Sequence, residues 1–318
     1  MIRFEVDTMN KIIDLIRQYD QILLYRHINP DDDALGSQAA MYYYIKTYFP
    51  DKNVVLMGAF TSDLVPHYFT EIPEAKINEV PSLAIVMDTA NKERVDGSLQ
   101  PANYIVKIDH HLIVEQFGDL NIVEEKTIAC AQILTLMMAE VSDRYPLTQE
   151  IAAPLYMGIV GDSNRFMYRD TDARTFKAAS LLLDTGIDID QLYRRMYLKN
   201  EKSLEIKRFI LNNYVNDGGV GYYIMRDEDL TALGVSREVG SNYITELADV
   251  DEIKIWIAFT EDVSQHIVRV SLRSRDYPVN KVAKQFKGGG HILAAGTTLS
   301  SLDQISVVVE SAKALLNQ

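Results

Sequence analysis

Carboxylate and imidazole side chains recur at four points that lie far apart in the sequence. They occur in HINPDDDALGS from His27, in VMDTAN around Asp88, in the tripeptide Asp109–His111, and in GDSNRF around Asp162. Each point follows an apolar run that is typical of a buried strand or helix, such as LAIVM before Asp88. We therefore expect these side chains to converge at the ends of core elements.

The types of these side chains indicate metal chemistry. Hard carboxylate oxygens mixed with neutral imidazole suit Mn²⁺, Fe²⁺ or Zn²⁺ better than Ca²⁺, and a set of this size can hold two ions. Asp31 and Asp33 are two residues apart on a predicted irregular turn, which lets their carboxylates reach different ions. Asp32 between them is interpreted as an ordinary surface or cap residue. The residues predict a dinuclear metal hydrolase.

Each motif also has an ordinary structural explanation. An acidic loop with a helix cap would account for Asp31–Asp33, a strand-end cap for Asp88 and an N-cap for Asp162. Adjacent histidines point in different directions, so one of them can bind metal while the other faces substrate, and Asp109 can orient an imidazole. The ordinary explanations would all have to hold at once, which favours the metal site.

The predicted elements explain how these residues would meet. From Lys11 to about Gly186, short apolar runs alternate with amphipathic segments, including a helix expected from about Leu35 to Phe49. This alternation is typical of an α/β fold in which a parallel sheet carries helices on both faces. Ligands of such sheets bind beyond the carboxyl ends of the strands. We assign residues 1–190 to this metal-binding catalytic domain.

A second domain is expected because 318 residues exceed what one ordinary core fills. Residues 191–214 have helical spacing without Gly or Pro and predict a helical linker. Residues 215–318 contain IKIWIAF and HIVRVSL, which TEDVSQ joins as a hairpin, together with a helix-like stretch. They predict a smaller α+β domain, and the two domains would form a cleft that closes on a ligand.

The second domain contains a candidate phosphate site. Three successive glycines permit close backbone approach to a ligand, and their N–H groups can line a concavity for phosphate. Two arginines alternate along a strand, so that one face receives both guanidinium groups, which grip phosphate bidentately. A surface hairpin would explain these residues equally well when they are taken alone. The candidate substrate-binding residues are Arg273, Arg275, Gly288, Gly289, Gly290 and His291.

Composition narrows the class of protein. A net charge of −13 argues against binding along an extended stretch of duplex nucleic acid, although it permits binding of a short phosphorylated ligand. No apolar run approaches the roughly 18 residues that span a bilayer, and the N-terminus lacks the layout of a signal peptide. We expect a cytoplasmic protein with no membrane partner. The single cysteine, Cys130, lies in an apolar helical pattern and is interpreted as a small buried hydrophobe.

With all four motifs in order, the chain resembles the DHH phosphoesterase superfamily, which is named after the tripeptide at Asp109–His111. SLRSR at 271–275 and KGGGHILAAG at 287–296 are similar to the DHH-associated nucleotide-binding domain. The length of the chain and its pair of domains resemble those of the bacterial oligoribonuclease (nanoRNase) and pAp-phosphatase group. That group includes phosphodiesterases that cut the linear dinucleotide pApA, which links it to cyclic-di-AMP turnover.

The resemblance also implies roles for individual residues. Asp88 would bridge two Mn²⁺ ions, and His111 would contact the scissile phosphate with Asp109 beside it as the second catalytic residue. Glycine is expected where Asn164 stands. The remaining ligands implied are His27 and Asp31 for one ion, and Asp33, His110 and Asp162 for the other.

The implied function is Mn²⁺-dependent hydrolysis of short oligoribonucleotides and linear dinucleotides to mononucleotides, and of pAp to AMP, by a hydroxide that bridges the ions. Three alternatives stay open. An inorganic pyrophosphatase shares the N-terminal motifs but should lack the GGGH element, and a long single-strand exonuclease generally needs a basic channel. A non-catalytic nucleotide sensor would not need a full ligand set. The sequence leaves open the substrate ranking, the cleavage polarity and the oligomeric state, a homodimer included.

Overall fold

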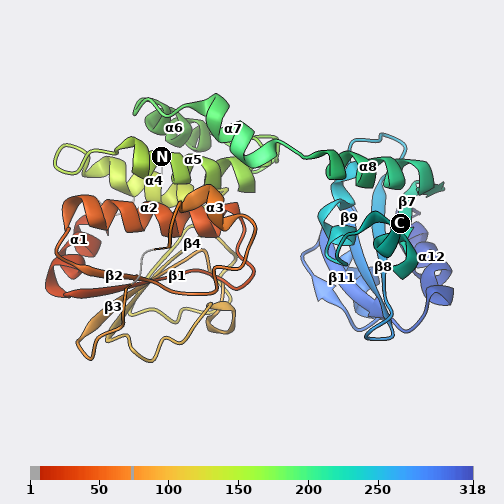
Figure 1. The fold of residues 1–318 in the computed structure, drawn as a ribbon, viewed down its shortest axis with the longest axis horizontal. Coiled ribbons are helices and arrows are strands. Elements are labelled where there is room, and N and C mark those ends of the chain that lie inside the picture. Colours follow the sequence, from red (N-terminus) through yellow and green to blue (C-terminus); the bar gives the residue numbers. More distant parts are fainter. Residues whose placement is uncertain (1–7, 73–74, 318) are drawn as a thin grey trace. The chain divides into compact units, whose positions relative to one another are not determined.

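The structure is a computed structural model that describes residues 8–72 and 75–317. The chain forms two compact units that divide between Leu198 and Lys199 (Figure 1). Each unit has its own sheet and its own hydrophobic clusters. The units are therefore described separately.

The first unit is built on a five-stranded parallel sheet of order β2-β1-β3-β4-β5. Every residue of β1 and β3 is buried, which explains why these strands are apolar along their whole length. Because the strands are parallel and in register, their carboxyl ends lie level at one edge of the sheet. The strands are β1 (Gln21–Tyr25), β2 (Asn53–Leu56), β3 (Ser82–Met87), β4 (Tyr104–Asp109) and β5 (Leu120–Val123).

Helices cover one face of this sheet (Figure 1). The main core lies between the sheet and four helices: α1 (Thr8–Gln18), α2 (Asp32–Tyr48), α4 (Cys130–Glu140) and α5 (Gln149–Asp162). The short α3 (Val65–Tyr68) contributes to the same core, and α6 (Ala173–Leu183) packs outside α4 and α5.

The second face of the sheet differs from the prediction. The α/β class and the parallel sheet are confirmed, but among the described residues this face is covered by loops and the 3-10 helix η1 (Lys92–Arg94), not by α-helices. Val95 and Leu99 pack there against Leu23 and Tyr25. The loop between β3 and β4 contains Gly97 and Pro101, which do not favour a helix.

The start of α2 also differs from the prediction. The helix begins at Asp32, three residues before the expected Leu35, so Asp33 lies in its first turn and not on an irregular turn. Asp31 is the N-cap, because its Oδ1 accepts a hydrogen bond from the backbone N–H of Ala34 at 3.0 Å. Two further carboxylates in the first turn suit the positive end of the helix dipole.

The predicted linker, 191–214, is divided between the units. Helix α7 (Ile189–Tyr197) packs on α5 in the first unit, whereas α8 (Glu201–Asn213) packs on β7 in the second. The catalytic and substrate-binding assignment of the two domains stays a proposal.

The second unit is the predicted α+β domain, built on a six-stranded mixed sheet of order β10-β11-β9-β8-β7-β6. The predicted hairpin is confirmed, since β8 and β9 pair antiparallel; only β7 and β8 run parallel. The strands are β6 (Val215–Asp217), β7 (Val220–Met225), β8 (Ile255–Asp262), β9 (Ile267–Ser274), β10 (Gly289–Gly290) and β11 (Ala294–Leu299).

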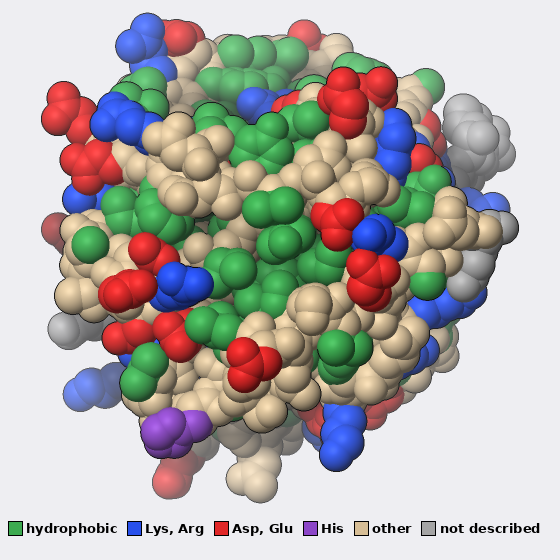
Figure 2. Space-filling model, turned by 90° about the vertical axis from the view of Figure 1, so that its right-hand side faces the viewer, with side chains coloured by type: hydrophobic (Ala, Val, Ile, Leu, Met, Phe, Trp, Pro, Cys, Tyr) green, Lys and Arg blue, Asp and Glu red, His purple; other side chains and the backbone are tan. Residues whose placement is uncertain are grey.

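Helices pack on both faces of the second sheet. One cluster holds α11 (Asn280–Gln285) and α12 (Ile305–Leu316), and another holds α8, α9 (Asp227–Leu233) and η2 (Ile244–Leu247). The helix-like stretch predicted before β8 forms only the short α10 (Val239–Asn242) and η2. Figure 2 shows hydrophobic side chains gathered in the middle of one face of this unit, with charged side chains around them.

No helix within the described ranges is long and apolar enough to cross a membrane.

Candidate metal centre

Each predicted metal ligand lies at the end of an element of the first unit. His27 follows β1, Asp88 follows β3, and His110 follows β4. Asp33 lies in the first turn of α2, and Asp162 is the last residue of α5. Three groups of side chains offer ligand atoms that lie within 4.8 Å of one another: His27 with Asp31 and Asp88, Asp33 with His110 and Asp162, and Asp88 with His110 and His111.

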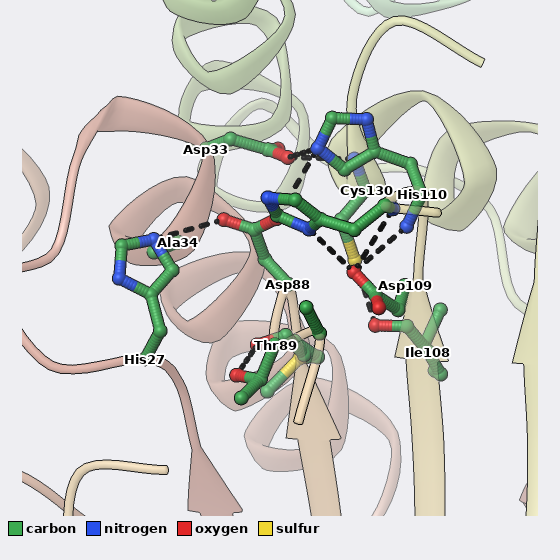
Figure 3. A network of polar contacts seen from close by, with 12 residues as sticks. His27, Asp33, Ala34, Asp88, Thr89, Ile108, Asp109, His110 and Cys130 are labelled. Carbon is green, nitrogen blue, oxygen red and sulfur yellow. Dashed lines mark hydrogen bonds and ion pairs between the residues drawn. The ribbon is translucent and has the colours of Figure 1, made fainter. Parts of the chain in front are cut away.

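Asp88 belongs to two of these groups and also lies beside His110 of the third (Figure 3). Its Oδ2 lies 3.3 Å from His27 Nε2, and its Oδ1 lies 3.3 Å from His110 Nε2. The residue is 1% exposed and has a positive φ of 51°, an uncommon conformation for a residue with a side chain. The strained turn after β3 thus directs one carboxylate toward both imidazoles.

The first group consists of His27, Asp31 and Asp88. His27 Nε2 lies 3.5 Å from Asp31 Oδ2, and His27 Nδ1 lies 2.7 Å from the carbonyl oxygen of Ile28. Because a carbonyl can only accept, we assign a proton to Nδ1, which leaves Nε2 to face the two carboxylates. Asp31 thereby caps α2 with one oxygen and offers the other to the group.

The second group consists of Asp33, His110 and Asp162. His110 Nε2 lies 3.8 Å from Asp33 Oδ2 and 3.3 Å from Asp162 Oδ2. The Asp33 carboxylate accepts hydrogen bonds from the backbone N–H groups of Cys130 at 2.6 Å and Ala131 at 2.8 Å. Asp33 therefore satisfies the first turn of α4, whose own N-cap residue, Ala129, has no side-chain acceptor.

The crowding of carboxylates shifts several pKa values. Burial would lower the pKa of His27 and of His110, but close contacts with carboxylates, Asp88 among them, raise each to about 10. Burial and the neighbouring charge of Asp88 raise the pKa of Asp33 to about 8. Burial would also raise the pKa of Asp88, yet its close contacts with the His110 and His27 imidazoles hold it below its usual value. Burial and the charge of Asp33 raise the pKa of Asp162.

These residues fit a pair of divalent cations. Asp88 Oδ1 and His110 Nε2 are buried and lie 3.3 Å apart, yet neither has a well-directed hydrogen-bond partner. The donor set of carboxylate oxygens and imidazole nitrogens is the one that Mn²⁺, Fe²⁺ and Zn²⁺ prefer. Bound cations would balance the negative charge of these carboxylates and displace protons from the imidazoles.

Asp109 contacts the second histidine of the tripeptide and belongs to none of the three groups. Its Oδ1 accepts from His111 Nδ1 at 2.8 Å and from the backbone N–H groups of His110 at 2.9 Å and His111 at 3.2 Å. The side chain of His111 is 23% exposed, whereas Asp109 is fully buried. Asp109 therefore orients an imidazole that solvent can reach.

The loop after Asp162 explains the unexpected asparagine. Asn164, Arg165 and Phe166 all have positive φ values, 47°, 62° and 65°. Asparagine tolerates this left-handed region better than most residues, so it can stand where we expected glycine. Asp162 ends its helix, which excludes the ordinary explanation of this residue as an N-cap.

The two candidate arginines of the second unit differ in their contacts. Arg273 lies on β9 and donates to the carbonyl oxygen of Leu272 at 2.9 Å. Arg275 donates to three carbonyl oxygens, those of Ile253, Ala248 and Val250, at 2.9, 2.7 and 2.7 Å. Arg275 thus supports the local fold, and Arg273 is the arginine that we retain as the first candidate for substrate.

The three candidate glycines also differ in whether the fold requires glycine at their position. A Cβ added to Gly288 would lie 2.2 Å from the carbonyl oxygen of Gly296, and Gly290 has a positive φ of 132°. Both need glycine for the fold. A Cβ on Gly289 would meet nothing within 4 Å, and His291 beside this strand is exposed. Gly289 and His291 are therefore open to a ligand.

Sequence reasoning missed two contributors to the centre. The N-terminus of α4 fixes Asp33, and Lys107 lies buried beside Asp109. A signal for the second was present, because Lys107 interrupts the apolar strand YIVKI. The first had no signal in the sequence, since only the tertiary fold brings Cys130 to Asp33.

Two family models match the chain: the DHH family N-terminal domain over residues 21–159 and the DHHA1 domain over residues 221–318. The chain belongs to the DHH family. It is 32% identical over 308 residues to the probable bifunctional oligoribonuclease and PAP phosphatase NrnA of Streptococcus mutans, covering 96% of this chain and 98% of that relative. It is 29% identical over 311 residues to the bifunctional oligoribonuclease and PAP phosphatase NrnA of Bacillus subtilis, covering 97% and 98%.

A solved structure shares the fold. The crystal structure of an exopolyphosphatase-related protein from Bacteroides fragilis aligns with a TM-score of 0.86 at 22% identity, covering 98% of this chain and 97% of that chain.

Proposed function

We propose that the protein is a phosphoesterase that uses two Mn²⁺ ions to hydrolyse short oligoribonucleotides and linear dinucleotides such as pApA to mononucleotides, and pAp to AMP. The observation that carries the proposal is the convergence of six proposed ligand side chains, Asp88 among them, from four segments that are distant in the sequence. The names of the full-length relatives support short RNA and pAp as the substrate classes.

The proposed ligands divide into two sets that share Asp88. His27 and Asp31 would hold one cation, and Asp33, His110 and Asp162 the other. The cations would supply a hydroxide nucleophile at neutral pH and neutralise charge on the phosphate. Asp33 is held in place by two backbone N–H groups, which reduces the rearrangement that ligand binding requires.

His111 is proposed to contact the phosphate. Its Nδ1 is bonded to Asp109, so its other ring nitrogen is the one left for substrate. With a proton on each ring nitrogen, His111 would donate from this nitrogen to a phosphoryl oxygen, and the hydrogen bond would strengthen as negative charge develops there. Asp109 holds the ring orientation and tautomer.

The second unit is proposed to bind the rest of the substrate. Arg273 offers a guanidinium group, and Gly289 and His291 offer an open backbone and an imidazole. These few groups suit a short ligand with few phosphates. Long duplex nucleic acid would be repelled by the net charge of −13.

The proposal is tested by hydrolysis of five compounds in Mn²⁺, with and without EDTA: pApA, an RNA 3-mer, an RNA 24-mer, pAp and pyrophosphate. We expect mononucleotides from pApA and the 3-mer, AMP from pAp, and little product from the 24-mer. The ratio of the pApA rate to the 3-mer rate then decides which is the better substrate. Cleavage of pyrophosphate alone would replace the proposal with a pyrophosphatase, and no metal-dependent turnover of any compound would indicate a nucleotide sensor.

A further inference from the structure

Lys107 is a charged residue at the centre of the first sheet. It lies on β4, two residues before Asp109, and its side chain is fully buried. Burying an ammonium group is costly unless other groups compensate it. Its partners therefore indicate why a lysine stands in this apolar strand.

The Lys107 ammonium contacts three segments of the candidate centre. It donates to the carbonyl oxygen of Ala90 at 2.8 Å, in the loop after Asp88, and to that of Glu115 at 2.9 Å, in the loop after His111. Its third neighbour is Asp109, whose Oδ2 lies 3.3 Å away. One buried cation thus joins both loops to the Asp109 carboxylate.

The two oxygens of Asp109 have separate tasks. Oδ2 faces Lys107 and has no hydrogen-bond donor of good geometry, whereas Oδ1 accepts from His111 Nδ1 at 2.8 Å. The same carboxylate therefore links the Lys107 ammonium to the His111 ring.

We propose that Lys107 is a positioning residue, which acts through Asp109 to hold the His111 imidazole in one orientation, with its Nδ1–H directed at Asp109. This inference rests on the proposed function, because it treats His111 as the residue that contacts the phosphate. Without the ammonium, Asp109 loses the charge that fixes Oδ2 and can rotate away from His111. The His111 Nδ1–H would then lose its acceptor, so the ring could turn or exchange its tautomer, and Nε2 would no longer be held toward the phosphate.

A purely structural role for Lys107 makes different predictions, and a matched control separates the two. Gln21 is also fully buried in this sheet, but at the amino end of β1, where it bonds Ser82 at 2.6 Å. Gln21→Met removes a buried polar side chain far along the strands from the centre. It should lower stability without changing the state of His111.

The first readout is the His111 tautomer, measured by ¹⁵N-histidine NMR on the metal-free full chain. The chain has six histidines, so single His→Asn variants can assign the signals. We expect one Nδ1–H tautomer at His111 in the wild type, in Lys107→Arg and in Gln21→Met, and a tautomer mixture in Lys107→Met. An unchanged His111 signal in Lys107→Met would overturn the proposal. This measurement needs no activity, so it stands even if the proposed function fails.

The second readout is steady-state hydrolysis of pApA at saturating Mn²⁺. We expect Lys107→Met to lower kcat by roughly 10–100-fold with KM within about twofold, the usual cost of losing such a supporting residue. Lys107→Arg should recover most of the loss. In a His111→Asn background, Lys107→Met should cost no further rate, because both changes remove the same interaction. If the rate losses of Lys107→Met and His111→Asn multiplied in the double variant, the proposal would be overturned. It would also be overturned if Gln21→Met lowered kcat as much as Lys107→Met does. Should Lys107→Met not fold, the same two readouts on Lys107→Gln decide the question.

Discussion

Asp88 is the one side chain that reaches both proposed metal sets, with one oxygen 3.3 Å from His27 and the other 3.3 Å from His110. Asp88→Ala removes a ligand from each set at once. We predict that turnover of pApA falls by at least about 10³-fold at every Mn²⁺ concentration, since the proposed nucleophile would be generated at this site. Steady-state kinetics measures the loss. Near-normal turnover by this variant would rule out the bridging role.

Arg273 is predicted to affect binding and not the chemical step. Arg273→Ala should raise KM for pApA by roughly tenfold with kcat unchanged, because it removes an interaction made equally in the ground state and the transition state. Arg269 is a matched control on the same strand, since its guanidinium is paired with Asp262 at 2.9 Å. A lower kcat with unchanged KM in Arg273→Ala would place this arginine at the reacting phosphate instead.

The pKa values of the centre predict that cation binding releases protons. Because hydrogen bonds to carboxylates raise the pKa of His27 and of His110 to about 10, both rings are protonated at pH 7 without a cation. A cation needs neutral imidazole, so it must displace these protons. We predict that Mn²⁺ affinity rises with pH between 6 and 8. Calorimetry in buffers of different ionisation enthalpy counts the protons, and an affinity independent of pH would contradict the prediction.

At the scale of elements, the crossing of α2 and α5 positions two proposed ligands. Gly36 lies three residues after Asp33, and a Cβ there would lie 2.4 Å from the carbonyl oxygen of Pro154 on α5. The helices approach closely because this position has no side chain. Asp162, at the end of α5, is thereby held near Asp33.

Gly36→Ala should push α2 and α5 apart. We predict a loss of about 1–3 kcal/mol in the free energy of unfolding, the usual cost of overpacking, together with weaker Mn²⁺ binding. Urea unfolding and Mn²⁺ titration measure the two effects. Gly289→Ala is the control for stability, since its added methyl group meets nothing within 4 Å. Unchanged Mn²⁺ affinity in Gly36→Ala would show that the crossing does not position the ligands.

At the scale of the whole molecule, the chain contains two units with separate cores. The clusters of the first unit contain no buried residue of the second, and all proposed ligands lie in the first. A ligand that binds one unit stabilises that unit by mass action, by about 2.7 kcal/mol at 100 times its dissociation constant.

We therefore predict two calorimetric unfolding transitions, of which only one moves to higher temperature in Mn²⁺. EDTA should reverse this shift, and Asp88→Ala should reduce it while leaving the other transition in place. A single transition that moves as a whole would mean that the two units unfold cooperatively.

The sequence by itself determined the type of fold and the candidate ligand residues. Short apolar runs of β1 and β3 sit in a parallel sheet that buries both faces, so composition alone marks them as strands. Polar residues just beyond such strands must lie at one edge of the sheet. This rule predicted that His27, Asp88 and His110 would meet, and the structure brings them together.

Only the tertiary structure decided which groups support these ligands. The α4 N–H groups that hold Asp33 come from residues nearly a hundred positions away, and no local pattern encodes such a contact. The helices cover one face of the first sheet because the connections on the other face stay as loops. Arg275 was predicted to share a strand face with Arg273, yet it lies one residue beyond the end of β9, and its guanidinium is engaged by three carbonyl oxygens. Strand alternation determines which face a side chain occupies, whereas its partners depend on long-range packing.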